Sequence, residues 1–366
     1  MLKQYHLRDF RLRLVIYVFA ITILGILLVG SADAEYQNQQ ILGMVLGTGA
    51  MLVLALIDYR IWMNLYWVIY AVNLVLLLAV HFFGDSSGGA KRWLDLGIRF
   101  QPSELTKLAL ILFFAHFFTK YREELNSWKM ILISLILVGA PLFLVYEQPN
   151  LSTTLMIAMV FCILIFAGGL SYKIVGGILV VLVPSVLIFF TLIMQEGQTI
   201  LRGYQLERIM AWLNPEAYPD IAYQQLNSII AVGSGQLYGK GLYNTDPSSV
   251  KNGNYIIEPQ TDFIFAVAGE ELGFIGCATI ILLLTLIVIE CLMIGKNARD
   301  REGMILCCGF GGLIACQSMV NICVATGLLP NTGVTLPFVS YGLTSLVVLY
   351  MGIGIVLNVG LQPKKY

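Results

Sequence analysis

Long apolar runs constrain the fold of this chain more than any other feature of its sequence. Ten segments are rich in aliphatic and aromatic residues and almost free of charge: 14–30, 41–57, 63–83, 103–119, 130–146, 151–168, 174–195, 263–290, 303–327 and 341–361. Each is close to the roughly 20 residues that a helix needs to cross the hydrocarbon core of a bilayer. The runs are continuous rather than alternating, which excludes a membrane β-barrel. We therefore predict an all-α polytopic membrane protein with about ten transmembrane helices.

The composition excludes several other classes of protein. Of the 366 residues, 58% are hydrophobic and 12% are charged, and the 22 basic and 22 acidic residues cancel. A soluble domain is about one quarter charged, and a disordered chain is far less hydrophobic. Without a basic surplus, we expect no nucleic-acid partner. The seven cysteines lie in or beside apolar runs, which indicates small apolar core residues rather than metal ligands.

The distribution of lysine and arginine predicts the topology. With the N-terminus in the cytoplasm, fourteen basic residues fall on the inside and seven on the outside. Without the long segment 196–262, which is a weak determinant, three remain outside. We therefore expect both termini in the cytoplasm and 196–262 as a large extracellular loop between helices seven and eight. This loop contains amphipathic pieces at 204–213 and 223–232, and the chain reads as a single transmembrane domain, 1–366.

Unusual polar residues collect in three outward segments, and the first precedes the fourth span. Lys91 and Arg92 could hold an anionic headgroup or pyrophosphate, and Trp93 beside them is either a substrate contact or an interfacial anchor. Glu104 and Lys107 are three residues apart inside the first turns of a membrane helix, where an unpaired charge is costly. A structural ion pair and direct substrate contact fit this pair equally well.

The second outward segment ends the long loop at Asp262. An aspartate at this position could simply cap the following helix through its side chain, or Thr261 could do so. It also lies where a polar loop meets an apolar wall, so its carboxylate could be desolvated and act as a base. Glu270 and Glu271 follow within the span, where they should pair with basic residues or face a wet cavity, and we expect a structural use.

The third outward segment, 327–342, contains two prolines and three glycines between two spans and ends near Ser340. Broken backbone at membrane depth is tolerated only inside the protein or against a water-filled cavity. The segment is either a re-entrant turn that only packs or part of an outward-opening site. The sequence contains no phosphate-binding GxxxxGK[ST] loop, HExxH or GxSxG motif.

The same three segments resemble the SEDS family (shape, elongation, division and sporulation). The matching pieces are Arg92-Trp93-Leu94-Asp95-Leu96-Gly97 through Gln101-Pro102-Ser103-Glu104-Leu105-Thr106-Lys107, Thr261-Asp262-Phe263-Ile264-Phe265-Ala266 through Glu270-Glu271-Leu272-Gly273, and Asn321 through Pro330, Gly333, Pro337 and Ser340-Tyr341-Gly342. The ten-span layout and the large outer segment also match, so the resemblance covers essentially the whole chain. Within the family, 204–244 is more similar to RodA-type than to FtsW-type members.

The resemblance implies a peptidoglycan glycosyltransferase that polymerises lipid II on the outer side of the bacterial cytoplasmic membrane. It implies a class B penicillin-binding protein and the elongation machinery as partners. The essential loop aspartate of the family falls on Asp262, its tryptophan on Trp93, and its membrane ion pair on Glu104 and Lys107. Two departures are Gln260, where many members have histidine, and Leu343 in place of a second glycine.

The chemistry expected of these residues is proton transfer. Asp262 is the predicted general base, which would take the proton of the acceptor hydroxyl that attacks the donor sugar. The remaining predicted site residues would bind substrate: Lys91, Arg92, Trp93, Glu104, Lys107, Arg208, Lys240 and Ser340. We expect no readable metal motif, although Mg²⁺ or Mn²⁺ could arrive with the pyrophosphate. An FtsW-like division or sporulation paralogue, a lipid II flippase or transporter, and a pure scaffold are the alternatives.

Overall fold

The computed structural model describes residues 10–87, 90–95, 97, 99–177, 180, 203–247, 249, 251–253 and 255–363. Eight helices in this part of the chain are long and apolar enough to cross a membrane: α1 (Leu12–Ala32), α2 (Ala34–Leu56), α4 (Tyr66–Phe83), α6 (Trp128–Glu147), α7 (Leu151–Gly168), α11 (Ile264–Lys296), α12 (Arg301–Ala325) and α13 (Leu343–Gly360). Each coincides with a predicted apolar run. The expected helical, multi-pass architecture is therefore confirmed.

The two other predicted spans have different outcomes. The run 103–119 forms α5 (Pro102–Lys120), a buried helix that begins at its proline. Its charged first turns leave it outside the set of eight, but it packs against α4, α7 and α12 within the bundle. The run 174–195 falls largely outside the described residues.

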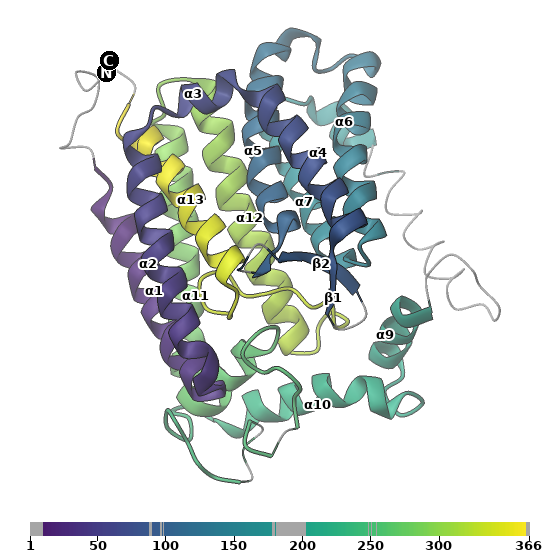
Figure 1. Cartoon of the computed structure of the whole chain (residues 1–366), viewed down its shortest axis with the longest axis vertical. Helices are drawn as coiled ribbons and strands as arrows, with labels where there is room; N and C mark the ends of the chain where they lie inside the picture. Colours follow the sequence, from purple (N-terminus) through teal and green to yellow (C-terminus); the bar gives the residue numbers. More distant parts are fainter. Residues whose placement is uncertain are drawn as a thin grey trace.

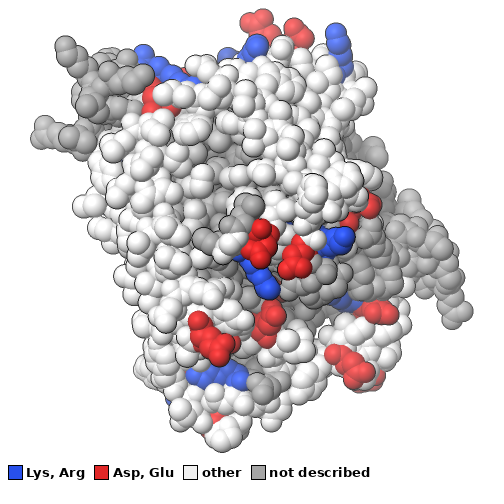
Figure 2. Space-filling view, viewed as in Figure 1, with Lys and Arg blue, Asp and Glu red and all other residues white. Residues whose placement is uncertain are grey.

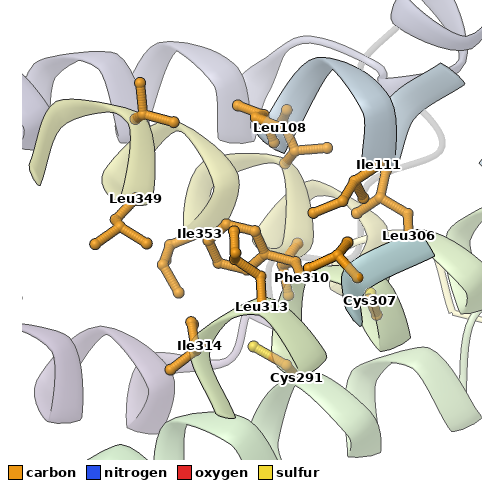
Figure 3. Packing of buried hydrophobic residues seen from close by; sticks show 14 of the residues in the cluster. Leu108, Ile111, Cys291, Leu306, Cys307, Phe310, Leu313, Ile314, Leu349 and Ile353 are labelled. Atoms are coloured by element: carbon orange, nitrogen blue, oxygen red, sulfur yellow. The ribbon is translucent and has the colours of Figure 1, made fainter. Parts of the chain in front are cut away.

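The helices run roughly side by side, with α12 near the centre of the bundle (Figure 1). It packs against α5, α7, α11 and α13, and α13 lies along α2. Phe310 of α12 occupies the space left by Gly352 of α13, and leucine and isoleucine side chains from neighbouring helices surround it (Figure 3). Short helices α3 (Tyr59–Asn64) and η3 (Arg122–Glu124) connect the spans at the upper end in Figure 1.

Charged side chains are distributed along the long axis of the bundle. On the face shown in Figure 2, they gather at the upper end and again in the lower half, around the hairpin and the loops. Most of the surface between these regions is uncharged, as expected for helices that contact lipid. The first and last described segments lie together, because a Cβ on Gly360 would be 3.6 Å from Cγ of Arg11.

The lower end carries the outward segments singled out in the sequence. The segment that precedes the fourth predicted span forms a small antiparallel sheet of β1 (Asp85–Ser87), β2 (Ala90–Asp95) and β3 (Arg99–Phe100), which the sequence did not predict. The amphipathic pieces of the long loop form α9 (Gly203–Leu213) and α10 (Pro219–Ser234), which match their predicted positions. α10 runs across the lower end of the bundle (Figure 1).

A break near the start of α11 shapes this end of the molecule. Gly273 has φ 65° and ψ −161°, a conformation that favours glycine and interrupts the helix. The amides of Phe274 and Ile275 then donate to the carbonyl oxygens of Gln236 and Leu237, at 2.8 Å and 3.2 Å. The loop after α10 thus supplies the acceptors that the broken helix lacks.

Candidate active site

Asp262 lies immediately before α11 and is half-buried. The N-cap of α11 is Phe263, and no side chain caps the helix, so the capping role considered for Thr261 and Asp262 is wrong. The carboxylate therefore forms no capping hydrogen bond to the first turn of α11. The backbone carbonyl of Asp262 accepts a 2.7 Å hydrogen bond from Nδ2 of Asn321 on α12, which fixes where the aspartate sits.

The turn between α12 and α13 covers Asp262 from one side. Gly333 has φ 72°, and a Cβ at this position would lie 3.1 Å from Oδ2 of Asp262. Asn321 holds this turn as well, because its Nδ2 also donates to the carbonyl of Val334 at 2.6 Å. One buried amide therefore ties the aspartate segment to the glycine turn that faces it.

Ser340 secures the other end of the same turn. Its hydroxyl donates to the carbonyl of Thr261 at 2.6 Å and accepts from the amide of Leu336 at 2.7 Å. The carbonyl of Ser340 accepts from Nε2 of Gln40 on α2. The buried hydroxyl is thus used by the backbone beside Asp262, which supports a positioning role rather than the substrate contact expected from the sequence.

The surroundings of Asp262 have opposing electrostatic effects on its carboxyl group. Burial raises its pKa from 3.8 to about 6, nearby Arg208 and Arg92 lower it, and Glu258 raises it. Removal from water disfavours the charged form, and the two guanidinium groups partly compensate. The result is a carboxylate that is ionised at neutral pH but more basic than an ordinary aspartate.

Arg92 and Arg208 reach this region from distant parts of the chain. Arg92 on β2 donates from Nε to the carbonyl of Gln148 at 3.3 Å, and from Nη2 to the carbonyl of Pro149. Arg208 on α9 donates to the carbonyl of Asn331 at 3.4 Å. Both arginines therefore also bind backbone carbonyls, Arg92 between α6 and α7 and Arg208 in the turn that covers Asp262, while their positive charges act on the Asp262 carboxylate.

Lys91 and Trp93 flank Arg92 on the same strand. The Lys91 side chain is exposed, and Trp93 is half-buried and pairs with Asp85 in the sheet. The strand therefore places both residues toward the lower end of the bundle in Figure 1, the end that the sequence predicts to face outward. Their predicted substrate contacts stay predictions.

Glu104 and Lys107 form a buried ion pair at 2.9 Å within α5. Nζ of Lys107 also donates to Oε1 of Gln317 on α12 at 3.2 Å. Nε2 of Gln317 in turn donates to the carbonyl of Thr335 at 3.0 Å. The pair is thus linked through one glutamine to the turn that covers Asp262, which the sequence did not indicate.

Lys240, a predicted substrate-binding residue, forms an ion pair with a glutamate of α11. Its Nζ contacts Oε1 of Glu270 at 2.7 Å, and Lys251 likewise pairs with Glu271. The expectation that the two glutamates of α11 pair with basic residues is confirmed. Because its charge is matched by Glu270, Lys240 is a weaker candidate for binding pyrophosphate than Arg92 or Arg208.

Gln317 is the site residue that the sequence reasoning missed. It lies four residues before Asn321, so both amides project from one face of α12. A pair of buried amides at this spacing within an apolar helix is the signal that could have revealed it.

The described residues do not fit a resident metal ion. Among them, no group of three or more histidine, cysteine, aspartate or glutamate residues could hold one. A divalent ion carried by the pyrophosphate stays a prediction, and no step below depends on it.

Comparison with known proteins identifies the family. The model for FtsW, RodA and SpoVE cell cycle proteins matches residues 10–365. The chain belongs to this family. It is 35% identical to the peptidoglycan glycosyltransferase MrdB of Escherichia coli K12, over 96% of this chain and 93% of MrdB. Stage V sporulation protein E of Bacillus subtilis 168 is 34% identical, over 95% and 96%.

Solved structures agree with this assignment. The rod shape determining protein RodA of Thermus thermophilus is 26% identical, with a TM-score of 0.67, and the match covers 98% of this chain and 97% of RodA. A chain from a peptidoglycan synthase complex is 28% identical, with a TM-score of 0.80 and coverage of 96% and 97%. The structural similarity therefore covers nearly the full length of this chain and of both matched chains.

Proposed function

We propose that this chain is a peptidoglycan glycosyltransferase that polymerises lipid II, with Asp262 as its general base. The observation that carries the assignment of the base is the desolvated carboxylate of Asp262, which does not cap α11 and lies beside two arginines at the proposed outward end of the bundle. The names of MrdB and of the synthase complex support the reaction class.

In the proposed step, an oxygen of the acceptor sugar attacks the anomeric carbon of the donor. Asp262 takes the proton of that hydroxyl as the new glycosidic bond forms. The bond between the anomeric carbon and the pyrophosphate oxygen breaks, and its electron pair leaves with the lipid pyrophosphate. Because this leaving group is already a stable anion, the second, protonated carboxyl of a typical glycoside hydrolase is unnecessary.

Arg92 and Arg208 are the cations best placed to stabilise the departing pyrophosphate, since both already act on Asp262. Lys91 and Trp93 on the exposed hairpin would meet the substrate as it approaches. Glu104, Lys107 and Ser340 would support the turn over Asp262 rather than touch the sugar.

The setting follows from the family. We propose that the protein lies in the bacterial cytoplasmic membrane, with both termini in the cytoplasm and 196–262 outside. The matching chain comes from a peptidoglycan synthase complex that coordinates polymerization and crosslinking, which supports our proposal of a crosslinking partner, a class B penicillin-binding protein. The elongation machinery is the further partner that we propose. A RodA-type role in elongation is our preference. FtsW of Geobacter sulfurreducens is nevertheless 33% identical, so a division or sporulation role is the alternative.

The deciding experiment is the polymerisation of lipid II by the purified chain, alone and with a cognate class B penicillin-binding protein. Glycan ladders from the parent protein and none from Asp262→Asn would support the proposal. Transfer of labelled lipid II between leaflets without polymer would instead support a flippase. Polymer formation by Asp262→Asn at the parent rate would remove Asp262 as the base.

A further inference from the structure

The helix α10 has an unusual distribution of side chains. Its buried face consists of small and polar residues, and its exposed face is apolar. Tyr223, Leu226 and Ile230, here called the outer stripe, follow one another along the exposed face. The residues on the buried face are Ala222, Gln225, Ser228 and Ala231. A helix that lies on a protein in water shows the opposite pattern.

The polar face of α10 holds the turn that leads to the candidate base. Nε2 of Gln225 donates to the carbonyls of Val324 and Leu329, at 2.9 Å and 2.6 Å. The hydroxyl of Ser228 donates to the carbonyl of Ala325 at 2.8 Å. These contacts secure the end of α12 and the start of the turn whose Gly333 faces Asp262.

An exposed apolar surface on α11 begins beside the loop that follows α10. The loop that follows α10 supplies backbone acceptors to the break in α11, so Leu237 lies beside Ile275. Ile275 and Phe274 are exposed residues of a helix long enough to cross the membrane. Leu237 and Tyr238 are also exposed, and they lie in the loop that directly follows the helix that carries the stripe.

The charge of α10 specifies the kind of surface that it would contact. The helix contains one aspartate, Asp220, and no lysine or arginine. A helix that binds anionic headgroups carries basic residues along its polar edge. The outer stripe therefore suits the apolar part of the bilayer interface, independently of anionic lipid.

We propose that α10 is an interfacial helix whose outer stripe is immersed in the leaflet at the outward end of the bundle. Its polar face meanwhile holds the turn over Asp262. The partner of the stripe is the bilayer itself. Through Gln225 and Ser228, the position of α10 in the leaflet sets the position of this turn.

Photo-crosslinking tests the contact without reference to activity. Benzoylphenylalanine is placed at Leu226 or Ile230 of the full chain in phosphatidylcholine nanodiscs, and adducts are identified by mass spectrometry. Phe274 serves as the lipid-exposed reference, and Asp95 on the hairpin as the water-exposed one. Lipid adducts at 226 and 230 support the proposal. Lipid adducts at position 274 but at neither position 226 nor position 230 would overturn the proposal. Adducts at 226 or 230 that form only with an added partner protein would overturn it as well.

The coupling to the turn is tested by activity, and this arm rests on the proposed function. The double variant Leu226→Gln with Ile230→Gln should lower the rate of glycan synthesis several-fold. The double variant Leu226→Met with Ile230→Met should retain the parent rate. Tyr172→Gln, which changes an exposed residue at the opposite end of the bundle, is the matched control. Parent activity in the glutamine variant would overturn the coupling. Absence of polymer from the parent chain would contradict the proposed function and leave the crosslinking result intact.

Discussion

At Asp262, the cost of burying a charge and the attraction of two arginines act on one carboxyl group. Burial has the larger effect, so the pKa rises to about 6. This places the group close to the value at which a carboxylate is both ionised at neutral pH and able to accept a proton. The chemistry proposed for the protein depends on this balance.

Replacing Asp262 by Asn removes the base with little change of shape. We expect the rate of lipid II polymerisation to fall by at least about 100-fold, since a general base contributes about 10²–10⁴-fold. The folded-state pKa is above the ordinary value, so ionisation of Asp262 lowers stability as the pH rises through 3.8 to 6. Asp262→Asn should therefore melt at or above the parent temperature at pH 7.5. If Asp262→Asn instead melted below the parent temperature, its loss of activity would be explained by unfolding.

The same pKa predicts the acidic limb of the pH profile. Below about pH 6, the initial rate of the parent should fall about tenfold per pH unit as Asp262 becomes protonated. Arg208→Gln removes a charge that lowers this pKa, so the limb should move to higher pH. Initial rates measured with lipid II from pH 4.5 to 8 check both the limb of the parent and its movement in Arg208→Gln. An unchanged limb in Arg208→Gln would show that another group controls the profile.

At the scale of elements, the turn between α12 and α13 depends on glycine. Gly333→Ala places a β-carbon 3.1 Å from Oδ2 of Asp262, at a φ of 72° that costs alanine about 1–2 kcal/mol. Gly169→Ala is the matched control, because Gly169 has φ 109° and open space around its Cβ position. We expect both variants to lose thermal stability, but Gly333→Ala alone to lose most of its polymerisation activity. Equal activity losses would argue against a specific contact with Asp262.

The ion pair in α5 makes a prediction about charge compensation. Glu104→Gln or Lys107→Met alone leaves one buried charge without its partner, a change that typically costs about 3–5 kcal/mol. The double variant should be more stable than either single variant in thermal unfolding. Its polymerisation should still fall below the parent rate, because Gln317 loses the donor from Lys107. A double variant with full activity would reduce the pair to a purely structural role.

At the scale of the whole molecule, the candidate site residues belong to segments at the lower end of the bundle in Figure 1, so the proposed topology can be tested directly. Alkaline phosphatase inserted after Gly241 should be active, and a fluorescent protein at the C-terminus should fluoresce in the cytoplasm. The opposite result would place Asp262 on the cytosolic side, away from an extracellular substrate.

Much of the architecture was predictable because hydrophobic length is a local property. Within the described residues, nine of the ten predicted apolar runs coincide with a helix, eight of them candidate spans and the ninth α5, and the amphipathic pieces coincide with α9 and α10. The hairpin at 85–100 was missed, since its strands are short and their pairing depends on contacts with the bundle. The break at Gly273 was also missed, because its acceptors come from a separate segment.

The sequence by itself determined that this chain crosses a membrane many times and that its unusual polar residues face one side. It also placed Asp262 among the candidate bases. Only the tertiary structure decided which of the other candidates act near that base. Arg92 and Arg208 lie close to it, whereas Lys240 is paired with Glu270 and Ser340 is bonded to backbone. The physical reason is that span formation depends on hydrophobicity along the chain, whereas pairing depends on distances between residues far apart in sequence.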